Sequence, residues 1–100
     1  MSKIVTAPFD GAKYIRTPKD VIDTLNDALE SGEAGYIAVA LGAIARSEDM
    51  TKIAAKTGVN RQALYTALGE NGNPTLGTLL KVLSALGIKL KCEADVAQAA

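Results

Sequence analysis

The stretch of residues 50–68, MTKIAAKTGVNRQALYTAL, limits the possible folds more than any other part of the chain. Its pattern predicts a short helix over residues 51–57, a tight turn, and a second helix that opens at Asn60. Gly58 accepts the positive φ that ends a helix abruptly, and the Asn60 side chain is a good N-cap. The pattern is typical of a helix-turn-helix, whose second helix enters the major groove of DNA.

The second helix of this stretch is predicted to have a buried and a polar face, at about 100° per residue. The buried positions of the two helices and their turn are expected to include Ile53, Val59, Leu64 and Ala67. The same arc of the second helix also takes in Ala63 and Leu68. The candidates for contacts with DNA bases are Asn60, Arg61, Gln62, Tyr65 and Thr66. Arginine pairs with guanine, glutamine with adenine, and threonine or tyrosine reaches a phosphate, a base edge or a thymine methyl group.

The local charge of this stretch supports a DNA-binding interpretation. Lys52, Lys56 and Arg61 occur between Met50 and Gly69, where no acidic residue is found. The alternative is an ordinary amphipathic helix hairpin with a solvated polar face. The turn glycine, the cap, the small Ala54 and the missing acids agree with each other, so they favour the helix-turn-helix.

The composition fits one small folded domain. The chain has 100 residues, of which 48% are hydrophobic, 22% are charged and 4% are aromatic, which favours a helical protein with a single core. Its net charge of zero argues against a non-specific nucleic-acid coat, which would be strongly basic. A specific binder with a small basic patch remains compatible, and we expect it to act as a homodimer whose DNA affinity falls with salt.

Several functional classes are disfavoured by residues that the sequence lacks. With no histidine, the chain has no His-based acid–base catalysis and no Cys/His zinc site. No nucleophile–base pair, metal-ligand cluster or phosphate-binding glycine loop can be assembled, so we expect neither an enzyme nor a cofactor. Cys92 is the single cysteine and is expected to be a small apolar filler. The role of Cys92 is not otherwise indicated by the sequence.

The expected location is the cytoplasm, without a membrane segment. Ile4 and Val5 are isolated among polar residues, so the N-terminus lacks the apolar region of a signal peptide. The longest uncharged run, residues 34–45, is too short to span a bilayer. This run forms most of a predicted helix over residues 33–46, which is apolar nearly all round and suits a central position. Gly35 and Gly42 within it are expected to allow close helix crossings.

Residues 1–16 are predicted to form an N-terminal arm and residues 17–100 the domain. Thr17, Pro18 and Asp20 predict a helix start with a capping box, and this helix is expected to run to Glu30. Its acidic side chains recur on one face, at Asp20, Asp23, Asp27 and Glu30. A solvated acidic face is the favoured interpretation, and a docking stripe for a basic protein partner is the alternative.

Residues 47–49 are predicted to end the central helix, and Asp49 is predicted to cap the next one. A last helix is predicted over residues 75–86, capped by Asn73 or Thr75 and ended by Gly87. Its leucines are expected to share one buried face, and its N-terminus suits a phosphate. Residues 88–93 alternate apolar and charged side chains, which predicts a short β-strand. Such a strand must pair with another chain, or the segment must pack as an extended tail, and both alternatives stay open.

Three motifs resemble one known family. They are TPKDVIDTLNDALESG, the helix-turn-helix stretch and GNPTLGTLLKVLSALGIKL. They are similar to the addiction-module antidote proteins, a HigA-like branch of the lambda-repressor-like DNA-binding proteins, over roughly residues 14–90. The resemblance implies an all-α, five-helix helix-turn-helix domain with a short C-terminal β-strand.

The resemblance also implies a function and a set of contacts. Such a protein is an antitoxin of a type II toxin–antitoxin system, which binds a small RelE/HigB-like toxin and represses its own operon by binding double-stranded operator DNA. The positions expected to hold DNA phosphates are Thr51, Lys52, Lys56, Asn73 and Thr75. Two alternatives remain: a prophage-type transcriptional regulator without a toxin, and a helix-turn-helix protein-interaction module that no longer contacts DNA.

Overall fold

The computed structural model of the chain describes residues 11–95. Within this range the chain forms one 3-10 helix, η1 (Gly11–Tyr14), and five α-helices. These are α1 (Pro18–Ser31), α2 (Ala34–Glu48), α3 (Met50–Thr57), α4 (Arg61–Ala67) and α5 (Leu76–Ala85). The predicted all-α class with five helices is therefore confirmed for the described residues. Most of the predicted N-terminal arm, residues 1–10, lies outside them.

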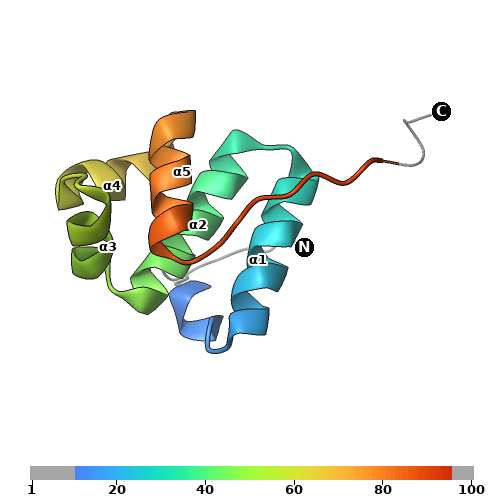
Figure 1. The fold of residues 1–100 in the computed structure, drawn as a ribbon, viewed down its shortest axis with the longest axis horizontal. Coiled ribbons are helices and arrows are strands. Elements are labelled where there is room, and N and C mark those ends of the chain that lie inside the picture. The colour runs from blue at the N-terminus through green and yellow to red at the C-terminus, as the bar shows by residue number, and fades with distance from the viewer. Residues whose placement is uncertain (1–10, 96–100) are drawn as a thin grey trace.

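Helix α2 is the central element of the fold. It packs against α1 and η1 on one side and against α3 on the other, and α5 in turn packs on α3 (Figure 1). Seven of the eight α2 residues from Ala38 to Ala45 are buried. Because α2 contacts neighbours on several sides, it needs apolar side chains around most of its surface. The helix continues to Glu48, two residues further than predicted.

The start of α1 forms the predicted capping box. The Thr17 hydroxyl oxygen accepts from the backbone N–H of Asp20 at 3.1 Å. In return, the Asp20 carboxylate accepts from the backbone N–H groups of Arg16 and Thr17, at 2.9 and 3.0 Å. These backbone donors hold the pKa of the Asp20 carboxyl below its ordinary value of 3.8. Gly32, with φ +68°, ends the helix.

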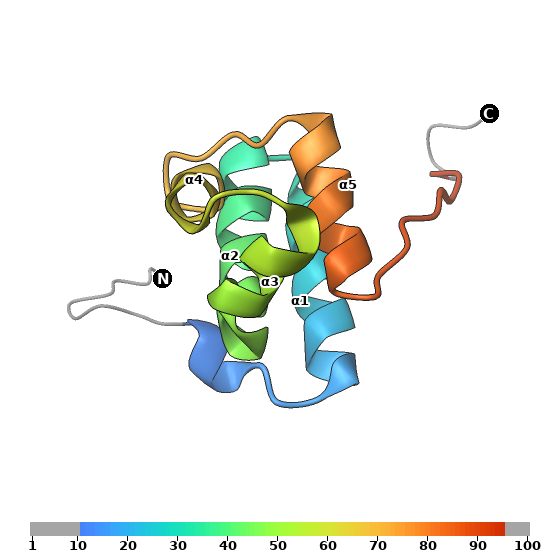
Figure 2. The same ribbon diagram turned by 60° about the vertical axis from the view of Figure 1, so that its left-hand side comes forward.

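The core joins all five α-helices, and α1 contributes Leu25. Its fully buried large side chains are Leu41, Ile44, Ile53, Leu64, Leu68 and Val82. Since side chains from five helices meet there, the short helices α3 and α4 are held by burial rather than by their own length. Figure 2 shows α3 in front of α2, with α4 above it and α5 beside it.

The predicted C-terminal strand is wrong: residues 11–95 contain no β-strand. After Gly87, with φ +75°, the chain is extended and lies along α1, where residues 88–93 line a shallow hollow with Ile22, Leu25 and Leu29. The physical reason is that a strand needs a neighbouring strand for its backbone hydrogen bonds. The rest of the described chain consists of helices and loops, so the segment is an extended tail. Cys92 within it is exposed, so the expectation that it fills apolar space is wrong.

The leucines of α5 do not share one buried face. Leu83 is buried and Leu79 and Leu86 are half-buried, whereas Leu76 and Leu80 are 67% and 49% exposed. The predicted set spans too wide an arc of the helix for one neighbour to cover. Only the side of α5 that faces α3 is buried, and Val82 completes it.

Two further features bear on function. No helix within residues 11–95 is both long enough and apolar enough to cross a membrane. The same part of the chain holds no group of three acidic, cysteine or histidine side chains placed to bind a metal ion.

Candidate nucleic-acid interface

The turn between α3 and α4 is fixed by local hydrogen bonds. Gly58 has φ +74°, and its N–H donates to the Ala54 carbonyl at 2.9 Å. The Thr57 hydroxyl donates to the Ile53 carbonyl at 2.8 Å and accepts from the Val59 N–H at 3.1 Å. The turn therefore satisfies the last carbonyls of α3. The contribution of Thr57 was not anticipated from the sequence, although threonine is a known donor to a carbonyl four residues earlier.

Helix α4 starts as predicted. The Asn60 side-chain oxygen accepts from the Ala63 N–H at 3.1 Å, which is an N-cap. Val59, just before it, is half-buried and packs against the core. The cap and the turn together set the direction in which α4 leaves α3.

Helix α4 has the two faces that its sequence predicts. Leu64 is fully buried and Ala67 is half-buried. All of the predicted base-contact residues are exposed: Asn60, Arg61, Gln62, Tyr65 and Thr66. Ala63 is exposed too, although it was expected on the buried arc. Leu64 alone points straight at the core in the middle of α4, so the buried arc is narrower than predicted.

Arg61 and Tyr65 form a pair on the exposed face. The Arg61 guanidinium carbon lies 5.4 Å from the centre of the Tyr65 ring, and one guanidinium nitrogen donates to the Tyr65 hydroxyl at 3.5 Å. This is a cation–π contact between residues four apart on a helix. This contact was not predicted, although its spacing of four residues is one at which helical side chains commonly meet. The pair holds two of the candidate base-contact side chains against each other.

Gln62 and Thr66 lie next to this pair. The Thr66 hydroxyl donates to the Gln62 backbone carbonyl at 3.2 Å, so its oxygen and methyl group remain outward-facing. The Gln62 side-chain amide makes no hydrogen bond to the described part of the chain. It therefore keeps a donor and an acceptor for an external partner.

Glycines hold the far end of α4 on its neighbours. A Cβ at Gly42 of α2 would lie 2.3 Å from the carbonyl oxygen of Leu68, which ends α4. A Cβ at Gly72, in the loop after α4, would lie 2.0 Å from the carbonyl oxygen of Ala67. Real Cβ atoms do not approach oxygen so closely. The close approach that was expected at Gly42 is confirmed, and it fixes the depth at which α4 sits. The one expected at Gly35 is not found, because a Cβ there would meet its nearest atom at an ordinary contact distance of 3.8 Å.

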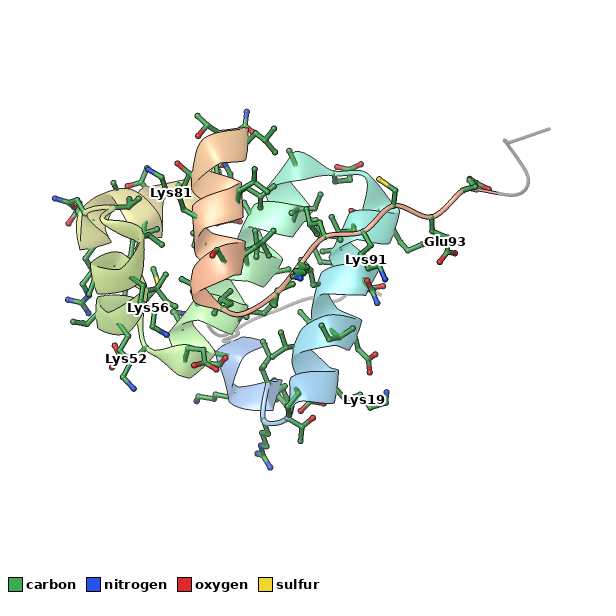
Figure 3. The ribbon with its side chains drawn as sticks, in the orientation of Figure 1. Lys19, Lys52, Lys56, Lys81, Lys91 and Glu93 are labelled. Atoms are coloured by element: carbon green, nitrogen blue, oxygen red, sulfur yellow. The ribbon has the colours of Figure 1, made fainter. Side chains whose placement is uncertain are left out.

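The predicted phosphate contacts at α3 differ in their surroundings. The Thr51 N–H donates to the Asp49 carboxylate at 2.8 Å, so this backbone group is already satisfied. Lys52 is exposed and points away from the helices (Figure 3). The Lys56 ammonium donates to the Ala85 carbonyl at 3.5 Å, at the C-terminal end of α5, where a cation is favoured.

The other phosphate candidates lie at the start of α5. The Thr75 hydroxyl oxygen accepts from the Thr78 N–H at 3.1 Å and so caps the helix. Asn73 is exposed in the preceding loop. Of the two predicted candidates, Thr75 and not Asn73 is therefore the N-cap of α5. Both residues follow α4 closely in the chain, and the loop that carries them is pinned to α4 by Gly72.

The acidic stripe lies on α1, across α2 from α3 and α4 (Figure 1). Asp20 belongs to the capping box, and Asp23 forms an ion pair with Lys19 at 2.6 Å. Asp27 accepts a short hydrogen bond from the Tyr36 hydroxyl of α2, which raises the pKa of Tyr36. Glu30 is exposed. Three of the four carboxylates therefore have partners within the protein, and of these only the capping role of Asp20 was predicted from the sequence.

The fold and this surface define a small helical protein that presents one short polar helix beside a basic one. A family model described as "Probable addiction module antidote protein" matches residues 5–94, so the chain belongs to this family. It is also 36% identical over 85 residues to an uncharacterized protein of Haemophilus influenzae, a match that covers 85% of this chain and 88% of that protein. No solved structure shows a significant match. The antidote part of the resemblance is confirmed, and the family implies a toxin partner.

Proposed function

We propose that the protein is a HigA-like antitoxin of a type II toxin–antitoxin system, which folds as a lambda-repressor-like helix-turn-helix domain and represses its own operon. In this proposal α3 and α4 form the helix-turn-helix, and α4 enters the major groove of operator DNA. The protein acts by binding, in the cytoplasm, and catalyses no reaction.

The observation that carries the DNA-binding proposal is the exposed face of α4. Arg61, Gln62 and Thr66 project from a helix whose other side is buried, and both ends of the helix are fixed. A rigid helix with such side chains suits readout of base edges. The basic residues of α3 lie beside it, without a competing acid between residues 50 and 69.

A homodimer is part of the proposal. One α4 has only seven residues, and a helix of this length reads few base pairs. Two copies related by a two-fold axis would place their α4 helices about 34 Å apart, one turn of DNA, on a palindromic operator. The area of contact with DNA would then double, which compensates for the zero net charge of each chain.

The toxin in this proposal is a small RelE/HigB-like protein. A toxin that acts on RNA would carry a basic surface, and the acidic stripe of α1 offers a complementary one. The stripe lies away from α3 and α4, so both partners would bind at once. Its most available member is Glu30, because the other three carboxylates have partners in the protein.

A gel-shift titration tests the DNA-binding proposal. The probe is the DNA directly upstream of the gene, at two salt concentrations, with unrelated DNA of the same length as control. Specific retention that weakens with salt would support it. Equal binding to both probes, with and without the product of the adjacent gene, would favour the protein-interaction module instead, for which the zero net charge is the best support.

The toxin partner is tested by co-purification with the product of the adjacent gene. We expect a stable complex that Asp23→Lys together with Glu30→Lys weakens, while specific DNA retention is kept. Glu48→Lys, at an exposed position on α2, is the matched control for a charge reversal outside the stripe. A neighbouring gene product that never binds the protein would favour the prophage-type regulator.

A further inference from the structure

Helix α5 leaves an uncharged stripe exposed on the side that the other helices do not cover. At about 100° per residue, Leu76, Leu80 and Ser84 follow one another along this stripe, one turn apart. Leu76 is 67% exposed and Leu80 is 49% exposed, and Ser84 is exposed as well. Lys81, the single charged residue of α5, lies at the edge of the stripe. Exposed apolar side chains that gather in one place mark an interaction site.

A hollow lies beside the C-terminal half of this stripe. Its lining includes Leu80, Leu83, Ser84, Ile88 and Leu90, from α5 and from the segment that follows it. Leu90 is 43% exposed, so the far wall of the hollow is apolar and accessible. The surface of α5 therefore has an apolar projection one turn before Leu80, at residue 76, and an apolar hollow after Leu80.

We propose that two copies of the chain associate through this stripe, with their α5 helices antiparallel and the two-fold axis at Leu80. The proposal rests on the homodimer of the proposed function and names the surface that forms it. The axis reverses the direction of α5, so a feature one turn before Leu80 in one copy meets a feature one turn after Leu80 in the other. Leu76 of each copy then enters the hollow beside Ser84 of the other copy.

The stripe has the spacing that helix packing requires. Residues four apart form the ridges that interdigitate when two helices cross at about 50°. Leu76, Leu80 and Ser84 form such a ridge. Ser84 is small, which leaves room for Leu76 of the other copy. Because the two copies are related by symmetry, this contact occurs twice, once on each side of the central pair of Leu80 side chains.

The charges around the stripe favour a second copy over the other partners. Lys56 and Lys81 border the stripe on the side of α3, and Lys89 borders it on the side of the C-terminal segment. The basic toxin of the proposed function would meet these lysines as like charges. DNA would attract the lysines but would leave the leucines without an apolar partner. A second copy covers leucines with leucines and leaves its lysines at the edge, where solvent and salt screen them.

The position of α5 also suits the spacing of two operator halves. Because α5 contacts α3, three helix contacts would separate the α3 helices of the two copies, about 24–30 Å at 8–10 Å for each contact. Helix α4 contacts α3, and one turn of DNA is about 34 Å. Association through the exposed Ile22 and Leu29 of α1 would place five helix contacts between the α3 helices, about 40–50 Å, because α1, α2 and α3 follow one another in Figure 1. The α5 stripe is therefore the apolar surface that fits the operator.

Sedimentation equilibrium of the full-length chain, without DNA or toxin, tests which surface forms the dimer. Leu80→Glu should weaken dimerisation at least about a hundredfold, because it places two carboxylates face to face at the axis. Leu76→Ala should weaken it at least about tenfold, because an apolar contact is lost in both hollows. Ile22→Glu, at an exposed apolar site on α1, is the matched control and should leave the dimer unchanged. All three side chains are exposed in the single chain, so circular dichroism should show an unchanged helix content.

Cysteine cross-linking locates the axis. In a Cys92→Ser background, Leu80→Cys should give a linked dimer on mild oxidation with diamide. Helix axes 8–10 Å apart, with each Cα about 2.3 Å from its axis, leave about 3.4–5.4 Å between facing Cα atoms, which overlaps the range of about 4.4–6.8 Å that a disulfide needs. Ser84→Cys in the same background should not link, because its two thiols lie about 12 Å apart along the helices.

Several outcomes would overturn the inference. A monomer at all concentrations would do so, and so would stronger linking at residue 84 than at residue 80. A dimer that Ile22→Glu breaks and Leu80→Glu does not would keep the homodimer of the proposed function but overturn this contact. Because neither DNA nor toxin is present, loss of operator or toxin binding with an intact dimer that depends on Leu80 would contradict only the proposed function.

Discussion

Gly42 of α2 and Leu68 at the end of α4 approach so closely that a Cβ on residue 42 would lie 2.3 Å from the Leu68 carbonyl oxygen. The contact joins the central helix to the helix that carries the candidate base-reading side chains. The position of α4 therefore depends on the absence of one methyl group.

Gly42→Ala is expected to destabilise the protein. The added methyl group meets a backbone oxygen, which cannot rotate away, so α4 must shift; overpacking of this kind costs about 1–3 kcal/mol. Gly35→Ala is the matched control on the same helix, because the nearest atom to its Cβ would be 3.8 Å away. We expect it to be neutral or to stabilise by up to about 1 kcal/mol, since alanine favours helices. Denaturant unfolding measures both, and equal effects would contradict the role of the Leu68 contact.

The sequence predicted the α3–α4 pair almost to the residue because its determinants are local. Gly58 and Asn60 act on neighbours within four positions. Helix α3 begins and ends within one residue of the expected bounds, and α4 begins directly after its predicted cap. The capping box of Thr17 and Asp20 is local in the same sense. Caps and turn glycines can be recognised without knowing the rest of the fold.

What the sequence could not supply depends on contacts between distant residues. Periodicity suggested that Leu76 and Leu80 are buried, but burial needs a neighbour, and α3 covers only one side of α5. The alternation of residues 88–93 suggested a strand, but no strand lies beside it in the single chain. Gly42 was expected to allow a close crossing, yet its partner, the Leu68 carbonyl, became known only from the fold.

Arg61→Ala should weaken specific operator binding by about 1–3 kcal/mol if Arg61 reads a guanine, as proposed. Arg61→Lys should recover only part of this loss, because lysine lacks the planar pair of donors. Fluorescence anisotropy with operator and unrelated DNA separates loss of specificity from loss of charge. An equal loss on both DNAs would identify Arg61 as a phosphate contact instead.

Tyr65→Leu tests whether the cation–π pair prepares Arg61 for DNA. The substitution removes the ring that lies 5.4 Å from the guanidinium but keeps an apolar side chain on an exposed site. The stability should change little, because exposed cation–π contacts contribute about 0.5–1 kcal/mol. Operator affinity should fall. It should fall less in the Arg61→Ala background, because Tyr65 then has no guanidinium to hold. A double-mutant cycle measures this coupling. Additive effects in that cycle would show that the two side chains act independently.

Asp49→Ala should destabilise the α2–α3 junction by about 0.5–2 kcal/mol, because the Thr51 N–H loses its cap. Asp49 also has φ +148°, a backbone conformation that residues with a Cβ rarely adopt. Asp49→Asn keeps the acceptor oxygen and should lose less stability.

In the proposed DNA complex, Asp49→Asn should also increase the affinity at low salt, because it removes an acid next to the candidate phosphate contacts. Thermal unfolding and anisotropy measure the two effects, and an alanine variant as stable as the asparagine variant would contradict the capping role.

The capping box of α1 predicts a specific dependence of stability on pH. The pKa of Asp20 is lowered in the folded protein, chiefly by the backbone N–H groups of Arg16 and Thr17. A group with a lowered folded pKa contributes stability above its unfolded pKa, here 3.8, and this contribution is lost as the pH falls through the folded pKa. Asp20→Asn cannot titrate, so it should be less stable than the natural protein at neutral pH. The difference should shrink below pH 3.8 as the natural carboxylate is protonated. Urea unfolding of both proteins at a series of pH values measures this difference in stability. The titration of all other carboxylates cancels in the difference. A difference that stays constant down to the lowest pH would show that the Asp20 carboxylate is not the stabilising form.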